Sequence, residues 1–150
     1  MNQTLSSYVK HDESRTTILQ IVIENIGRGL AKDIQFTLSR PIPSKAWGLS
    51  IDDAKPAEPM TEGPLIDGVP ALGPGDSRKI AWGQYGGLTK ALSGGSISLN
   101  YEYKDDNGKL KSQMAILECR SFTGTDAVDS EAVRTIKQLK RIASAVEKIA

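Results

Sequence analysis

The chain has only one cysteine, Cys119, and one histidine, His11, among its 150 residues. A lone thiol can form neither a disulfide within the chain nor a cluster of thiolate metal ligands, and it suits a reducing compartment. One histidine, in a stretch that we expect to be loose, cannot supply a positioned catalytic base or the several imidazoles of a zinc hydrolase. We therefore expect no enzyme, no catalytic residue, no metal site and no cofactor.

The chain also lacks an excess of charge and a long apolar run. Its 19 Lys and Arg face 18 Asp and Glu, for a net charge of +1. Nucleic-acid binders usually carry a clear basic excess, because neutralised phosphates supply most of their affinity. No run approaches the roughly 20 apolar residues that span a bilayer, and the first residues do not follow the pattern of a signal peptide. These absences predict a cytoplasmic protein that does not bind nucleic acid and that contacts a membrane only through an anchor outside this sequence.

In the first 125 residues, apolar and polar side chains mostly alternate with the two-residue period of β-strands. Residues 96–103 (SISLNYEY) alternate apolar and polar side chains, and Asn107-Gly108 is the strongest short signal for a hairpin, with residues 109–119 as the returning strand. The other predicted strands cover residues 5–10, 16–24, 32–38 and 77–82. About seven strands, with no helix before residue 126, predict an immunoglobulin-like antiparallel β-sandwich over residues 1–125.

The middle of the chain is rich in proline and lacks the alternation of the flanking segments. All seven prolines lie between residues 41 and 74, where the sequence shows little periodicity. A stretch of this length without regular structure is unusual inside a compact domain. We expect short edge strands around residues 46–51 and 64–66, joined by loops.

Residues 126–150 change to the period of an amphipathic helix. Its apolar stripe consists of Ala132, Ile136, Leu139, Ala143, Val146 and Ala150. A stripe of this size is not left exposed in a monomer, so we expect it to pack on the sandwich or on another chain, and self-association through this helix stays open.

The opposite face of the same predicted helix carries a basic stripe. It consists of Arg134, Lys137, Arg141 and Lys148, flanked by Lys140. A solvated face explains such a stripe, and so does a surface for an acidic partner or a lipid headgroup. The helix contains no aromatic residue, which argues against insertion into a membrane.

Two segments of the sequence resemble a known kind of domain. Residues 22–27 (VIENIG), followed by Gly29 and Ala31, resemble the NxGxxxA opening of immunoglobulin-like adhesion domains of the CARDB kind, and residues 72–77 (LGPGDS) look like their LxPGxS turn. Residues 101–108 (YEYKDDNG) are similar to the last hairpin of uncharacterised bacterial sandwich proteins, which often carry a membrane anchor. The resemblance covers roughly residues 16–120, whereas the proline-rich segment and the terminal helix depart from it. It implies a sandwich whose loops bind proteins or glycans, and it leaves open the soluble part of an anchored bacterial protein.

The remaining loop residues suggest weaker candidates. Asp105, Asp106 and Asn107 have the oxygens that calcium prefers, but they also have the turn chemistry of a hairpin, and no complete calcium loop follows. A carboxylate enzyme would have to use Asp52, Asp53 or Glu58. Three aromatic residues form a candidate platform for a sugar ring: Trp47, Trp82 and Tyr85.

The sequence therefore predicts a non-enzymatic module that binds another protein through loops or a sheet edge. The alternative is a sandwich that binds a small ligand or glycan through the three aromatics. Exposure of both tryptophans in one concave surface would favour the alternative, and their burial would count against it.

Overall fold

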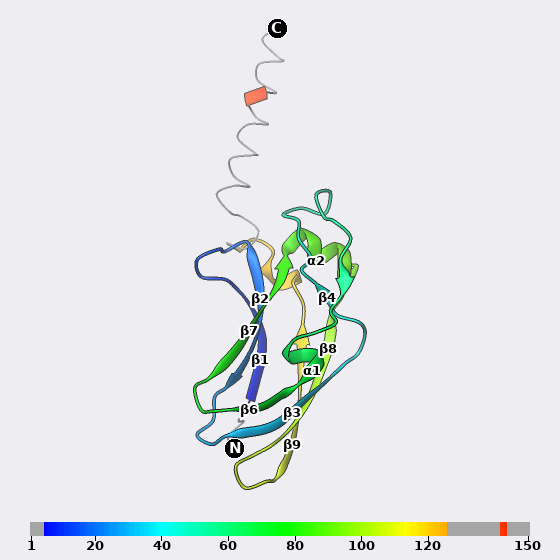
Figure 1. Cartoon of the computed structure of the whole chain (residues 1–150). Coiled ribbons are helices and arrows are strands. Elements are labelled where there is room, and N and C mark those ends of the chain that lie inside the picture. Colours follow the sequence, from blue (N-terminus) through cyan, green and yellow to red (C-terminus); the bar gives the residue numbers. More distant parts are fainter. Residues whose placement is uncertain (1–4, 126–141, 144–150) are drawn as a thin grey trace.

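The computed structural model describes residues 5–125 and 142–143, and these are mainly β with antiparallel sheets (Figure 1). The first sheet has three strands in the order β1-β2-β7: β1 (Leu5–His11), β2 (Ile18–Asn25) and β7 (Ser77–Gln84). The second has four strands in the order β6-β3-β8-β9: β6 (Val69–Leu72), β3 (Ala31–Leu38), β8 (Ile97–Lys104) and β9 (Leu110–Leu117). The two sheets face each other across one apolar core, an arrangement consistent with a β-sandwich.

Alternation along the strands builds this core. Ile97, Leu99, Tyr101 and Tyr103 of β8 are buried, while the residues between them are more exposed. The central strand β2 is an exception, because Val22 is buried together with its neighbours on the other face. Burial on both faces is what the run of β-branched residues in residues 16–24 predicts, and this prediction is confirmed.

The hairpin between β8 and β9 is also confirmed, with a longer turn than a two-residue loop. Gly108 has φ 77°, a conformation that glycine adopts without steric cost. The Asp105 carboxylate accepts hydrogen bonds from the backbone N–H groups of Asn107 (3.0 Å) and Lys109 (2.9 Å). Asp105 therefore acts as a turn residue.

A buried asparagine joins the turn after β2 to the end of β6. Asn25 is fully buried, and its Nδ2 donates to the backbone oxygens of Gly29 (2.9 Å) and Leu72 (2.7 Å). Its Oδ1 accepts from the Gly27 N–H at 3.0 Å, and its own N–H donates to the Asp76 oxygen at 3.0 Å. The asparagine and glycine of the NxGxxxA pattern thus join the turn that follows β2 to the turn that follows β6.

The proline-rich segment differs from the prediction. A short ribbon pairs β4 (Pro43–Ser44) with β5 (Glu58–Pro59), and residue 46 makes only an isolated bridge to Gly83. Residues 64–67 form a helical turn, α1 (Pro64–Asp67), in place of the predicted edge strand. Pro64 is the first residue of α1, where its missing N–H costs nothing and its fixed φ suits a helix.

The expectation that no helix precedes residue 126 is wrong, because a second helix, α2 (Tyr85–Leu92), follows β7 directly. Leu88 and Leu92 lie four residues apart and bury one face of α2. Gly86 and Gly87 are poor helix formers, so the local sequence conceals this helix. A single 3-10 turn, η1 (Arg120–Phe122), follows β9.

The predicted C-terminal helix and its basic stripe lie outside the described residues, except for Ile142 and Ala143. These two residues are helical, and the Ile142 side chain is 60% exposed. The packing of residues 126–150 on the sandwich or on another chain therefore stays a prediction. Within the described ranges, no helix is long and apolar enough to cross a membrane.

Candidate functional site

The loop after β4 is fixed tightly to the junction of β7 and α2. The Ala46 N–H donates to the Trp82 oxygen at 3.1 Å, and the Gln84 N–H donates back to the Ala46 oxygen at 3.0 Å. Two further bonds fix Gly48, whose N–H donates to Gln84 Oε1 at 2.8 Å and whose oxygen accepts from Gly87 N–H at 3.0 Å. This network holds the loop as a defined surface at the α2 end of the molecule.

Glycines make the close approach of these segments possible. A Cβ on Gly86 would collide with the backbone of Ser50, and one on Gly87 would collide with the backbone of Ala46. The periodicity of the sequence does not predict this close contact. Its available signal was the pair of adjacent glycines immediately before the four-residue spacing of Leu88 and Leu92.

A groove opens between the β4–β5 ribbon and α2, with a volume of about 290 Å³. We call it the ribbon groove; it is lined by Pro41, Ile42, Pro43, Lys55, Pro56, Ala57, Glu58, Pro59, Lys90 and Ala91. Four of these residues are prolines, which have no backbone N–H to donate and whose φ is fixed. The groove is therefore mainly a preformed apolar surface.

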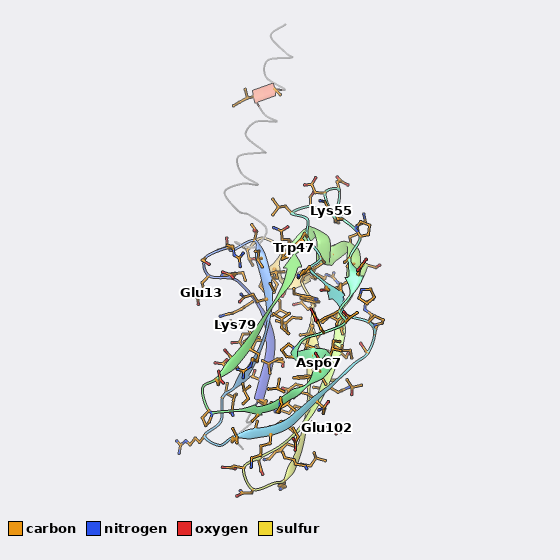
Figure 2. All side chains as sticks on the ribbon, in the orientation of Figure 1. Glu13, Trp47, Lys55, Asp67, Lys79 and Glu102 are labelled. Carbon is orange, nitrogen blue, oxygen red and sulfur yellow. The ribbon has the colours of Figure 1, made fainter. Side chains whose placement is uncertain are left out.

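The ribbon groove carries more positive than negative charge. Lys90 Nζ donates to the Ala54 backbone oxygen at 3.2 Å, which holds its ammonium beside the groove. Lys55 is exposed in the loop that leads to β5, at the same end of the molecule as Trp47 (Figure 2). Glu58 on β5 is the only carboxylate among the lining residues, against these two ammonium groups.

The three aromatic candidates do not share an exposed surface. Trp82 is fully buried in the core, and its Nε1 donates to the Pro43 oxygen at 3.1 Å. Trp47 is 36% exposed, whereas Tyr85 is partly buried with its hydroxyl hydrogen-bonded to Thr123 Oγ1 at 2.7 Å. Trp82 is thus buried under the β4–β5 ribbon, bonded to Pro43, and is not exposed to a ligand.

The structure does not gather the other candidates into a site. His11 is the last residue of β1, paired with Leu19, and not part of a loose stretch. Asp52 and Asp53 are exposed in a turn. Among residues 5–125 and 142–143, no three His, Cys, Asp or Glu side chains are grouped to hold a metal ion. The basic residues Arg134, Lys137, Lys140, Arg141 and Lys148 lie outside the described residues.

Cys119 is buried beside α2, and its Sγ lies 3.5 Å from Thr89 Oγ1. Burial raises the pKa of this thiol, and the thiolate is the reactive form. The arrangement is that of a small apolar residue in the core.

Comparisons with known proteins add a family without an assigned role. A family model described as a domain of unknown function (DUF8453) matches residues 4–123. No curated protein and no solved structure matches the chain.

Proposed function

The chain belongs to the DUF8453 family, and we propose that it is a non-enzymatic, immunoglobulin-like interaction module that binds an extended peptide of another protein. The ribbon groove is the proposed binding surface. The observation that carries this proposal is an apolar groove walled by prolines, with the Pro43 oxygen held by Trp82 Nε1 on one wall and Lys90 held by the Ala54 oxygen on the other.

The walls of the groove suit a peptide ligand of a particular kind. Because the prolines donate no backbone hydrogen bonds, an occupant gains little by turning its own backbone toward them. Apolar side chains inserted beside Ile42 and Ala57 would instead be removed from water. The bound peptide would be extended, with alternate side chains inserted into the groove and its backbone facing the solvent.

Charge narrows the class of peptide further. Lys55 and Lys90 place two ammonium groups beside the groove against the one carboxylate of Glu58. An acidic residue in the ligand would therefore be attracted at this rim. The hydrogen bond of Trp82 to the Pro43 oxygen and the fixed φ of the prolines support the proposal too, because a preformed surface loses little conformational entropy on binding.

A selection from a random peptide library displayed on phage, against the full chain, tests the proposal. We expect enrichment of sequences that combine an acidic residue with apolar residues, and dissociation constants can be measured by fluorescence polarisation. Ala91→Glu, at an exposed position of α2, and Lys55→Glu should each weaken binding by about tenfold or more, because both add negative charge at the groove. In ¹⁵N spectra, the amide signals of Ile42 and Ala57 should shift on binding.

Lys109→Glu is the matched control, because it makes the same change of charge as Lys55→Glu, and a larger one than Ala91→Glu, in the β8–β9 hairpin at the opposite end of the molecule (Figure 1). It should leave the affinity unchanged. The proposal is abandoned if no peptide is enriched, or if neither groove variant weakens binding more than this control does.

The glycan alternative retains Trp47 and Tyr85 but loses Trp82, which is buried. A glycan array distinguishes the two functions. Glycan binding that is lost in Trp47→Ala and unchanged in Ala91→Glu would replace the peptide proposal.

We extend the proposal to residues 126–150, as an amphipathic helix that packs its apolar stripe on the sandwich. Its basic stripe would then face outward, toward the same class of acidic partner. A membrane anchor in a longer parent chain is compatible with this arrangement.

A further inference from the structure

Strand β9 is an edge of the four-stranded sheet, and β1 of the other sheet lies beside it without pairing with it. In the part of the chain that the structure describes, the two main sheets have four edge strands, β1, β7, β6 and β9. Natural sheets blunt such edges with proline or charge. Pro70 interrupts β6, Arg78 and Lys79 lie side by side in β7, and β1 ends on Lys10 and His11. Strand β9 (LKSQMAIL) has no proline and a single charge.

The outer face of β9 also carries an exposed apolar stripe. Leu110, Met114 and Ile116 are 62%, 64% and 50% exposed, at alternating positions of this edge strand. Scattered exposed apolar residues need no explanation, but three on one face of a free edge mark an interaction surface.

Polar atoms on the inner side of the same edge lack partners. A hollow of about 430 Å³ lies between β1 and β9, lined in part by Ser7, Gln113 and Met114. Ser7 Oγ and Gln113 Oε1 are buried there without a hydrogen-bond partner. A buried acceptor without a donor is costly, so Gln113 Oε1 is a place where an added amide or hydroxyl donor would be favourable.

We propose that a second copy of this chain pairs with β9 in antiparallel register around a two-fold axis at Gln113. Ile116 of each copy then lies opposite Leu110 of the other, and Met114 lies opposite Ser112. The two Gln113 side chains face each other, so the Nε2 of each can donate to the Oε1 of the other. The two four-stranded sheets become one continuous sheet, and the second strand fills the hollow.

The register follows from geometry. Side chains directly opposite in an antiparallel pair point to the same face, so the axis must pass through a residue and not between two residues. An axis at Met114 places Gln113 opposite Ala115, which has no donor in its side chain. An axis at Ser112 places Gln113 opposite the donor Lys111 but leaves Ile116 opposite Gly108 of the turn. The axis at Gln113 supplies the missing donor and pairs the two apolar ends of the stripe.

Electrostatics permit this pairing. The one charged residue of β9, Lys111, lies opposite Ala115 of the second copy and not opposite another lysine. On the outer face, Glu102 and Lys104 of β8 pair with Ser112 and Leu110, which separate them from the charges of the other copy. Like charges directly opposite each other destabilise paired strands, and this register places none in that position.

Sedimentation velocity of the full chain, from about 1 to 500 µM, tests the association, since small interfaces are typical of weak complexes. We expect a monomer–dimer equilibrium in this range. Met114→Lys should raise the dissociation constant at least tenfold, and so should Leu110→Glu. Both positions are more than half exposed, so the fold should persist, which far-UV circular dichroism checks. Ile51→Lys is the matched control, because Ile51 is a similarly exposed apolar residue far from β9 in the sequence, and it should leave the constant unchanged.

A cysteine cross-link tests the register. Gln113→Cys should give a disulfide-linked dimer with oxidised glutathione, which accepts the two electrons, whereas Asn107→Cys in the hairpin turn should not. The buried Cys119 does not compete.

A full chain that is monomeric throughout the range overturns the proposal, including the case in which residues 126–150 of the same chain cover β9. A dimer that neither β9 variant weakens, or that cross-links equally at both cysteines, overturns it as well. The proposal does not involve the ribbon groove, so peptide binding is tested independently.

Discussion

Replacing Asn25 by alanine should be among the most destabilising polar substitutions in this protein. The change removes three side-chain hydrogen bonds. The bond to the Leu72 oxygen is fully buried, and leaving that acceptor unpaired costs about 1–3 kcal/mol. The bonds to Gly29 and Gly27 are partly buried, so water can replace part of them, at about 0.5–1.5 kcal/mol each. The sum is about 2–6 kcal/mol, a large share of the roughly 5–15 kcal/mol that stabilises a typical domain.

Urea unfolding followed by tryptophan fluorescence measures this loss, because Trp82 is fully buried in the folded state. Asn100→Ala is the matched control, since Asn100 is exposed on β8, and it should change the free energy of unfolding by no more than about 0.5 kcal/mol. An Asn25→Ala loss below about 1 kcal/mol, or no larger than that of Asn100→Ala, would refute the assignment of Asn25 as the link between the two loops.

Asn25→Asp adds a test with a pH dependence. The introduced carboxylate would face two backbone oxygens in place of a donor, so the folded state raises its pKa above the unfolded value of about 3.9. The folded state then binds the proton more tightly, and stability relative to the wild type falls as pH rises above about 4. The deficit should therefore be smallest in acid and larger at neutral pH. An equal deficit at pH 4 and pH 7 would contradict this reasoning.

Three further predictions concern other parts of the fold. Gly108→Val should lower the free energy of unfolding by about 1 kcal/mol or more, because φ 77° is strained for a β-branched residue, and Gly108→Asn should cost less. Truncation after Thr125 should lower the melting temperature at every protein concentration if residues 126–150 pack on the sandwich; an unchanged value contradicts that packing. Labelling of Cys119 by a thiol reagent should be slow in the folded protein and fast in urea, because burial shields the thiol and raises its pKa. The raised pKa means that the folded state retains the proton, so this residue should contribute a loss of stability as pH rises above about 8.5.

The strands that the sequence predicts correctly are those whose local pattern and tertiary environment agree. Residues 96–103 alternate because one face of β8 lies against the core, and Gly108 marks the hairpin because its conformation is local. The strand over residues 16–24 is readable because it is buried on both sides. In each case, the residues themselves carry the information, since side-chain period and backbone preference act over a few neighbours.

Tertiary structure alone decided the surfaces on which the proposals depend. Helix α2 forms with two glycines at its start because the backbone near Ala46 leaves no room for larger residues, and this contact joins segments some forty residues apart. Trp82 is in the core and Trp47 is not, although the sequence offers no reason to separate them. The ribbon groove is formed by α2 and by the ribbon that Trp82 contacts. In the sequence, its residues could therefore be recognised only as a proline-rich stretch.

The free edge of β9 shows the same limit most clearly. Its alternating sequence predicts a strand, and the strand is there, but nothing in that pattern says whether a neighbour covers its second side. Strand order depends on which segments of the whole chain pair, a choice made by long-range contacts. The sequence alone therefore predicted a returning strand over residues 109–119, which forms as β9 over the slightly shorter range Leu110–Leu117. The packing of the two sheets decided that Leu110, Met114 and Ile116 lie exposed, because the apolar core covers only the opposite face of the four-stranded sheet, and strand order decided that the second edge of β9 has no described partner.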